Sequence, residues 1–517
     1  MFLELNVTVI IEKKISDMKN YFYRVYLENK KINFKLLSYT TIFFLLILNF
    51  SLLHKYNIFV GDDGVLASIF SGKYYLEEKF SIMCSEIDFH KLYYYIIGGA
   101  YIYYYYFFTF LTDIFSLEYR WINAGSFILF FSSLIFFLLT IKRFSYSLLL
   151  SVIFLTLEPF LVLSHSIRHD IFIFFGNSLL IYSLFLKPSN YKLLIELLSL
   201  IFITIHPSGA PLILAIIIFY LFKKEFKRIF ILLVLSMIIL FFNALLKGIA
   251  NLETLNSILE LSSGAHSNSA FFSFSLLLEI KSIFYNLYDY FYNAKYKRHL
   301  IELVIFFLYA STFFQFKNFS RELKIFSFFP LIYLFGYLML NYFNISYLKF
   351  FYYFFLVYFS FYIFEIKGNN FKIALSFFMG CTLFIFLGVF FVFNFHNPWK
   401  LIDKNFNKIQ NKISSNSIVS APYYYSLINP KIANNYLPIS QLDEPGKDKC
   451  YSKYQKGNKK ADYVITDTRH LNNYEGSKRI ESYLTNYTMI ESIKIGRLGT
   501  MNLDKNGKLY LYKLNSF

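Results

Sequence analysis

Cysteine and charge are both scarce in this sequence of 517 residues, and each shortage excludes a class of protein. The three cysteines, Cys84, Cys381 and Cys450, are far apart and form no Cys-x-x-Cys or Cys/His spacing, so neither a zinc site nor a disulfide framework is indicated. Only 16% of the residues are charged, whereas 56% are hydrophobic, and the mean hydropathy is +0.45. One soluble core cannot hide that much apolar surface, so a bilayer must cover the excess.

Long apolar runs follow one another along the chain and end near Phe395. Leu36 to Leu53, Ile122 to Ile141 and Ile229 to Leu246 are examples, each near the ~20 residues that span hydrocarbon as a helix. Counting onward on this criterion gives about eleven spans. The sequence therefore predicts a polytopic α-helical membrane protein.

The net charge of +18 gives the predicted spans a direction. Its Lys and Arg gather in short loops between apolar runs, as the positive-inside rule expects of cytoplasmic loops, so nucleic acid is not indicated as a partner. The pattern requires Tyr93 to Leu111 to lie at the membrane interface, as juxtamembrane helices, and the many tyrosines there suit the headgroup level. An odd number of spans then places the C-terminus outside the cytoplasm.

Three regions follow: a cytoplasmic segment 1–35, a multi-spanning domain 36–395 whose outer loop is 54–119, and a soluble extracytoplasmic domain 396–517. In the last region, polar residues, Gly, Pro and Asn replace the long apolar runs. Short β-rich runs predict strands and one segment predicts a helix, so we expect a mixed α/β domain. The strands are expected at Ser417 to Ala421, Ala461 to Thr466 and Lys508 to Leu514, and the helix at Lys478 to Tyr487.

Two adjacent carboxylates, Asp62 and Asp63, stand between glycines a few residues beyond the first apolar run. One acid of such a pair can take a proton from a nucleophile while the other orients it or tunes its pKa, because like charges so close do not both ionise freely. A polar turn held by Asx hydrogen bonds explains the same residues without chemistry.

A second polar element, Ser164 to Asp170, joins two apolar runs. Ionisable groups at a membrane boundary are costly unless they are paired or hydrated. Arg168 can hold a phosphate oxygen and Asp170 can complete an acidic site with Asp62 or Asp63, or the two can simply pair with each other.

Weaker candidates lie on the same predicted side of the membrane. His206 ends an outward span and can donate to a phosphate or cap a helix, and Lys349 opens a later span, where it can meet a lipid phosphate or snorkel. Glu86, Asp88 and His90 are metal-competent residue types without an established ligand spacing. No cofactor is predicted; a divalent metal is compatible with the sequence but not indicated by it.

In their order along the chain, these features resemble the GT-C superfamily of membrane glycosyltransferases, of the protein O-mannosyltransferase and aminoarabinose transferase type. The resemblance covers roughly residues 36 to 250: a first span, an outer loop with an acidic pair, a Tyr-rich juxtamembrane segment, an Arg opening the next span, a basic turn, and an Arg-x-Asp element. Arg120, Lys142-Arg143 and Arg168-His169-Asp170 stand in the last three places. A Pro-Pro or Lys-Pro element that usually precedes the Tyr-rich segment is replaced here by residues 88–92.

The resemblance implies a sugar donor linked to a polyprenyl phosphate, and a lipid, glycan or protein as acceptor. It implies that Asp62 or Asp63 is the general base, that Asp170 supports the acidic site, and that the phosphate is stabilised by Arg168, His206 and Lys349. Two other classes remain open: a lipid or polysaccharide transporter or flippase, and a polymerase or ligase of lipid-linked glycans.

Overall fold

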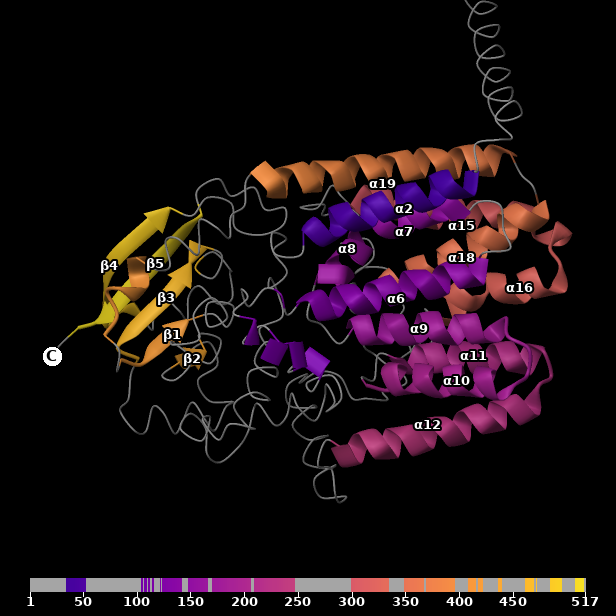
Figure 1. The fold of residues 1–517 in the computed structure, drawn as a ribbon, viewed down its shortest axis with the longest axis horizontal. Coiled ribbons are helices and arrows are strands. Elements are labelled where there is room, and N and C mark those ends of the chain that lie inside the picture. Colours follow the sequence, from indigo (N-terminus) through magenta and orange to yellow (C-terminus); the bar gives the residue numbers. More distant parts are fainter. Residues whose placement is uncertain are drawn as a thin grey trace, which may run out of the picture. The chain divides into compact units, whose positions relative to one another are not determined.

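The structure is a computed structural model that divides the chain into two compact units, residues 1–48 and 49–517. Helix α2 (Phe34–Ser51) carries the chain from the first unit into the second (Figure 1). The structure describes residues 34–52, 104–105, 107–108, 110–111, 114–115, 121, 123–141, 147–165, 170–205, 209–246, 299–333, 348–366, 369–395, 408–414, 417–421, 436–438, 461–468, 471, 484–494 and 507–515.

Helices form the described elements between residues 123 and 395 (Figure 1). The first group comprises α6 (Asn123–Ile141), α7 (Ser147–Thr156), α8 (Glu158–His165), α9 (Asp170–Leu184), α10 (Asn190–Ile203), α11 (Ala210–Phe222) and α12 (Phe226–Leu246). The second comprises α15 (His299–Thr312), the 3₁₀ helix η4 (Phe313–Asn318), α16 (Arg321–Ser327), α18 (Leu348–Ile366) and α19 (Asn369–Phe395). The three example runs are confirmed as helices α2, α6 and α12, with small shifts at their ends.

Short connections make consecutive helices antiparallel and give the bundle two distinct ends. Residues 185–189 join α9 to α10, and residues 223–225 join α11 to α12. We call the end with these connections the basic end, because Lys187 and Lys223 lie there. The opposite end, where α9 begins at Asp170, we call the site end.

Aromatic rings fill the centre of the bundle. Phe154 of α7 lies 5.0 Å from Phe137 of α6 and 5.9 Å from Phe174 of α9, measured between ring centroids. Tyr353 of α18 completes the cluster, at 5.3 Å from Phe174 and 5.8 Å from Phe137. Such offset and edge-to-face contacts add stability beyond area burial, so this cluster ties four helices together.

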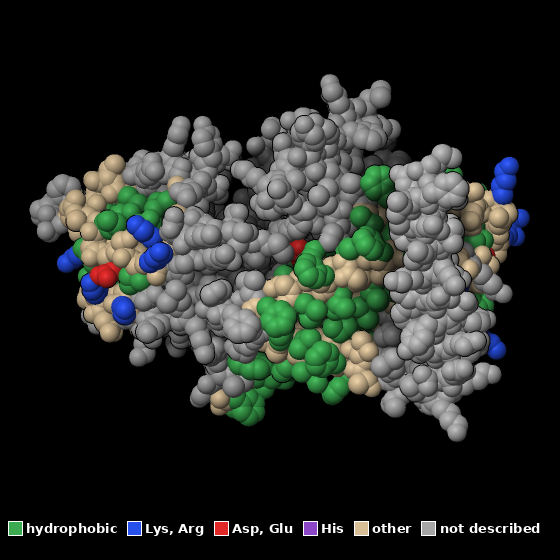
Figure 2. Space-filling view, turned by 90° about the horizontal axis from the view of Figure 1, so that it is seen from above, with side chains coloured by type: hydrophobic (Ala, Val, Ile, Leu, Met, Phe, Trp, Pro, Cys, Tyr) green, Lys and Arg blue, Asp and Glu red, His purple; other side chains and the backbone are tan. Residues whose placement is uncertain are grey.

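The outer surface of the helices is also apolar, which a soluble monomer rarely tolerates over a large area. Phe230 of α12 is 68% exposed and Phe384 of α19 is 78% exposed. Hydrophobic side chains cover the described helices on the face displayed in Figure 2. In the part of the chain that the structure describes, Asn123–Ile141 and Asn369–Phe391 are long and apolar enough to cross a membrane.

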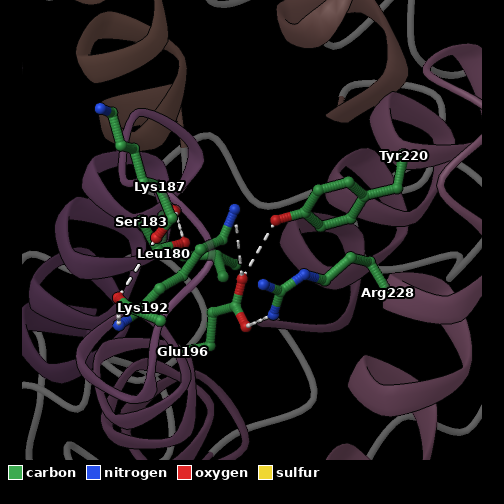
Figure 3. Close-up of polar contacts among 8 residues, drawn as sticks. Leu180, Ser183, Lys187, Lys192, Glu196, Tyr220 and Arg228 are labelled. Carbon is green, nitrogen blue, oxygen red and sulfur yellow. Dashed lines mark hydrogen bonds and ion pairs between the residues drawn. The ribbon is translucent and has the colours of Figure 1, made fainter.

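A buried carboxylate joins three helices at the basic end (Figure 3). Glu196 of α10 accepts a hydrogen bond from the Tyr220 hydroxyl of α11 at 3.1 Å, and its other oxygen lies 3.4 Å from Nη1 of Arg228 on α12. The Lys192 ammonium lies 3.9 Å away, one turn earlier on α10. Ser189 caps α10 by accepting from the backbone N–H of Lys192, at 3.2 Å. The side chain of Glu196 is only 1% exposed, so these partners replace its hydration.

The C-terminal region contains a five-stranded mixed sheet with the order β2-β1-β3-β5-β4. β1 pairs in parallel with β2 and β3, whereas β5 pairs antiparallel with β3 and β4. All three predicted strands are confirmed, as β1, β3 and β5. The predicted helix Lys478 to Tyr487 lies largely outside the described residues, and Tyr487 begins a strand that was not predicted. The strands are β1 (Val419–Ala421), β2 (Tyr436–Pro438), β3 (Tyr463–Asp467), β4 (Tyr487–Lys494) and β5 (Lys508–Leu514).

Candidate functional site

Among the site residues expected from the sequence, Asp170 is the one whose surroundings the structure describes. Lys349 is described as a backbone position, the second residue of α18. The others lie outside the described residues: Asp62, Asp63, Arg168 and His206. The site is therefore built here from Asp170 and from the helix ends around it.

Asp170 is the first residue of α9 and its side chain is fully buried. A helix N-terminus carries partial positive charge, which stabilises a carboxylate there. Tyr105 interacts with it electrostatically: burial raises the pKa of the Tyr105 phenol well above its usual value, and the neighbouring charges of Tyr104 and Asp170 raise it further, against the lowering effect of a hydrogen bond to Ser126. The phenol therefore stays protonated beside the carboxylate.

Two consecutive tyrosines connect the start of α6 to the start of α9. The Tyr105 hydroxyl lies 2.5 Å from Oγ of Ser126, and the Tyr104 hydroxyl donates to the backbone oxygen of Gly125 at 2.8 Å. Both rings meet Phe172 edge-on, with centroids 5.0 and 5.9 Å away. Since these contacts involve the first turns of α6 and α9, the N-terminus of α6 also lies at the site end.

Gly125 allows the tyrosine segment to approach α6 closely. A Cβ atom there would lie 2.9 Å from Cε1 of Tyr104 and 2.9 Å from Cδ2 of Phe108. We expect G125A to overpack this contact and to lower the free energy of unfolding by about 1–3 kcal/mol. The midpoint of thermal unfolding in detergent measures the effect.

Gly388 of α19 provides the control for G125A, because a Cβ there would meet nothing within 4 Å. G388A should leave the midpoint unchanged or raise it, since alanine favours a helix over glycine by up to about 1 kcal/mol. Equal midpoints for the two variants would contradict the close approach at Gly125.

His165, the last residue of α8, fixes the end of α2 beside the site. Its Nε2 lies 3.1 Å from the backbone oxygen of Asn49, and its Nδ1 lies 2.6 Å from Oγ of Ser164. The side-chain amide of Asn49 donates to the backbone oxygen of Leu155 at 3.1 Å. The ring of Phe50 contacts Trp121 and Phe127 beside the start of α6. The chain that leads into the predicted outer loop therefore leaves α2 at the site end.

The start of α18 lies at the same end of the bundle as the start of α9. Phe350, which follows Lys349, has its ring 6.4 Å from that of Phe174, one helical turn after Asp170. The other end of α18 is at the basic end, where Glu365 accepts hydrogen bonds from the side chain and the backbone N–H of Ser320 at 2.7 and 3.1 Å. The backbone of Lys349 is thus at the site end.

Gly209 shapes the connection between α10 and α11. A Cβ atom on it would lie 2.0 Å from the backbone oxygen of Ile203, so a larger residue would force the backbone apart. Pro211 follows within the first turn of α11, where its missing N–H would be unpaired anyway. α10 ends and α11 begins at the site end, and His206 lies outside the described residues.

Among the comparisons with known proteins, only the comparison of structures finds a match. No protein-family model matches the sequence, and no curated protein matches it. Two solved structures do match: ArnT from Cupriavidus metallidurans bound to undecaprenyl phosphate, with a TM-score of 0.52 and 10% identity, and the same protein in the apo state, with 0.54 and 9%. The chain has the fold of ArnT. The matches cover 92% and 93% of this chain and 98% of the ArnT chains.

The likeness to ArnT is one of fold, and it agrees with the fold expected from the sequence resemblance. It extends well beyond residues 36 to 250, the part of the chain that carried the sequence resemblance.

Asn49, Asn123 and Tyr105 are examples of site-end residues with buried polar groups that the sequence argument did not single out. Asn49 and Asn123 stand near the edges of apolar runs, where a buried polar side chain is costly unless it is used. A polar residue at the edge of an apolar run was the signal in the sequence that could have identified these two asparagines. Among the described residues, no group of three or more His, Cys, Asp or Glu side chains could hold a metal ion.

Proposed function

We propose that this chain is a multi-pass membrane glycosyltransferase that moves a sugar from a polyprenyl-phosphate donor to a lipid, glycan or protein acceptor. The observation that carries the proposal is the ArnT fold over 92% of the chain, because one of the matching ArnT structures is bound to undecaprenyl phosphate. The apolar outer surface of α12 and α19 supports placement in a membrane.

The proposed site lies at the site end of the bundle, on the extracytoplasmic face. The basic end would then face the cytoplasm, in accord with the positive-inside rule, with residues 1–35 on that side and the C-terminal domain outside. A polyprenyl phosphate has a charged head and an apolar tail, so a site at a membrane boundary satisfies both parts of it.

In the proposed reaction, Asp62 or Asp63 removes the proton from an acceptor hydroxyl as its oxygen attacks the anomeric carbon. The bond between that carbon and the phosphate oxygen breaks, and polyprenyl phosphate leaves with the electron pair. Because no covalent enzyme intermediate forms, the configuration at the anomeric carbon inverts. The charge on the phosphate is stabilised by Arg168, His206 and Lys349.

Asp170 supports the acidic pair in this scheme. It is buried at the start of α9, beside the protonated phenol of Tyr105. The N-terminus of α9 stabilises a negative charge at this position, so the side chain can orient the base or a cationic group facing the phosphate.

D170N tests the proposal, because asparagine keeps the shape of the side chain and removes its charge. We expect kcat for transfer from a sugar-loaded polyprenyl phosphate to fall about 100-fold. The assay follows sugar transfer by purified protein in detergent, where no membrane separates two compartments. A transporter would show no transfer there, so absence of transfer by the wild type would refute the proposed function, and full activity of D170N would refute the role of Asp170.

A further inference from the structure

Positive charge at the basic end gathers where α11 ends and α12 begins. Lys223, Lys224 and Lys227 lie in or directly beside this connection. Arg321, the first residue of α16, donates a hydrogen bond from Nη2 to the backbone oxygen of Phe222 at 3.3 Å, which brings the start of α16 to the end of α11. The four cations therefore stand around one meeting point of three helices, which we call the basic junction.

The acids near the basic junction do not neutralise it. Glu196 is buried against Arg228, so its charge is used inside the bundle (Figure 3). Among the described side chains of the junction itself, Glu225 is the one acid, and it is exposed. None of the ion pairs between described residues includes Lys224 or Arg321. The junction is therefore a positively charged surface that an anion from outside the chain can reach.

Lys224 adopts a backbone conformation that disfavours any side chain. Its φ is 59°. It follows the last residues of α11 in a Schellman motif, in which its N–H donates to the backbone oxygen of Leu221 and the N–H of Glu225 donates to that of Tyr220, both at 2.9 Å. Glycine fits this position without steric cost, whereas a residue with a Cβ atom is strained. The end of a helix favours a cation, but Lys223 already supplies one. A second lysine in a strained position indicates that its ammonium has a use other than stability.

Exposed aromatic side chains begin directly beside the basic junction. Phe222 at the end of α11 is 52% exposed, and Phe226 and Phe230 of α12 are 65% and 68% exposed. Phe226 and Phe230 are four residues apart, so they share a face of α12. A molecule bound here therefore meets cations at one end and an apolar helix surface at the other.

We infer that the basic junction binds an anionic phospholipid of the membrane leaflet at this end, with its phosphate against Lys224 and Arg321 and its acyl chains along Phe226 and Phe230. A guanidinium has five N–H donors in a planar fork, and a hydrogen bond to Phe222 occupies one nitrogen, so the rest of the fork suits phosphate oxygens. A free phosphate would leave the aromatic rings uncovered. This inference rests on the placement of the helices in a membrane and not on sugar transfer, and its site is at the opposite end of the bundle from the candidate functional site.

The test titrates purified protein in an uncharged detergent with dioleoyl phosphatidylglycerol or with dioleoyl phosphatidylcholine. Binding is measured by native mass spectrometry of the protein with its bound lipid and by the rise of the thermal unfolding midpoint. We expect phosphatidylglycerol to bind the wild type more tightly than phosphatidylcholine. K224G and R321Q should each weaken the binding of phosphatidylglycerol about fivefold, the contribution of one Lys or Arg beside an anionic lipid surface.

K224G separates lipid binding from folding. Without added lipid, its unfolding midpoint should equal or exceed that of the wild type, because glycine relieves the strain at φ 59°. Weaker lipid binding by a variant that is no less stable does not come from misfolding. K494Q is the matched control, because Lys494 is an exposed lysine of β4 and its substitution removes the same charge outside the helices. It should bind phosphatidylglycerol as the wild type does.

Four outcomes would each overturn the inference. Equal binding of phosphatidylcholine and phosphatidylglycerol by the wild type would show that the charge of the lipid is not recognised. Wild-type affinity for phosphatidylglycerol in both K224G and R321Q would show that the lipid binds elsewhere. A rise of the midpoint with glycerol 3-phosphate as large as that with phosphatidylglycerol would identify a site for free phosphate. A lower midpoint of K224G without lipid would show that Lys224 serves stability itself. None of these outcomes involves sugar transfer, so each leaves the proposed function standing.

Discussion

Replacing Asp62 or Asp63 with asparagine is expected to remove sugar transfer almost completely, lowering kcat by about 10²- to 10⁴-fold. The reason is that an amide cannot accept the proton of the attacking hydroxyl. The acid that serves as base should show the larger loss, and its partner a smaller one, because the partner tunes the pKa of the base without taking the proton. Initial rates of transfer from a loaded polyprenyl phosphate measure both variants.

Glu77 and Glu78, in the same predicted outer loop, provide the control for the acidic pair. E77Q and E78Q remove one negative charge each from that loop and should retain wild-type rates. Full activity in both D62N and D63N would show that neither carboxylate is the base. In that case the carboxylates would be residues of a polar turn.

Removing the carboxylate of Glu196 is expected to give the largest loss of stability. E196A leaves Lys192 and Arg228 facing each other at the basic end without their common partner, and it leaves the Tyr220 hydroxyl without its acceptor. Breaking a buried ion pair by removing one partner typically lowers the free energy of unfolding by about 3–5 kcal/mol. Unfolding of the purified protein by heat, or by increasing concentrations of a denaturing detergent, measures the change.

E196Q separates the hydrogen bond from the charge. Its side-chain oxygen can still accept from Tyr220, so its loss should be smaller than that of E196A. E225Q is the surface control, because Glu225 is an exposed acid in the connection between α11 and α12. An unfolding midpoint of E196A equal to that of E225Q would show that Glu196 does not hold the three helices together.

The sequence predicts the helices well because their signal is local. Runs of apolar residues of bilayer length identify α2, α6 and α12 directly. The same is true of β3, whose residues are all buried and which begins with the apolar residues Tyr463 to Ile465. β2 consists of three residues ending in Pro438, and β4 has mostly exposed or half-buried side chains, so neither has an apolar run of its own. Pairing with neighbouring strands defines them, and that pairing is not local.

In the candidate site, too, the sequence predicts what depends on neighbouring residues and misses what depends on tertiary contacts. Asp170 is predictable because a carboxylate beside Arg168 between two apolar runs is unusual in the sequence alone. The role of Tyr105 depends on its contact with Ser126 and on the charge of Asp170, which come from different helices. Asn123 is conspicuous only when the structure reveals that its buried amide has no hydrogen-bond partner among the described residues. Such properties arise from tertiary packing, so a single sequence does not contain them in readable form.

The ring cluster of Phe137, Phe154, Phe174 and Tyr353 also bears on how the protein moves during turnover. An aromatic side chain has two rotatable angles, so fixing it in place loses less conformational entropy than fixing a long flexible side chain such as methionine. Interlocked rings do not deform gradually; they either keep their contacts or lose them. We therefore expect α6, α7, α9 and α18 to behave as one rigid block, so that loading and release of the proposed lipid carrier require motion outside it.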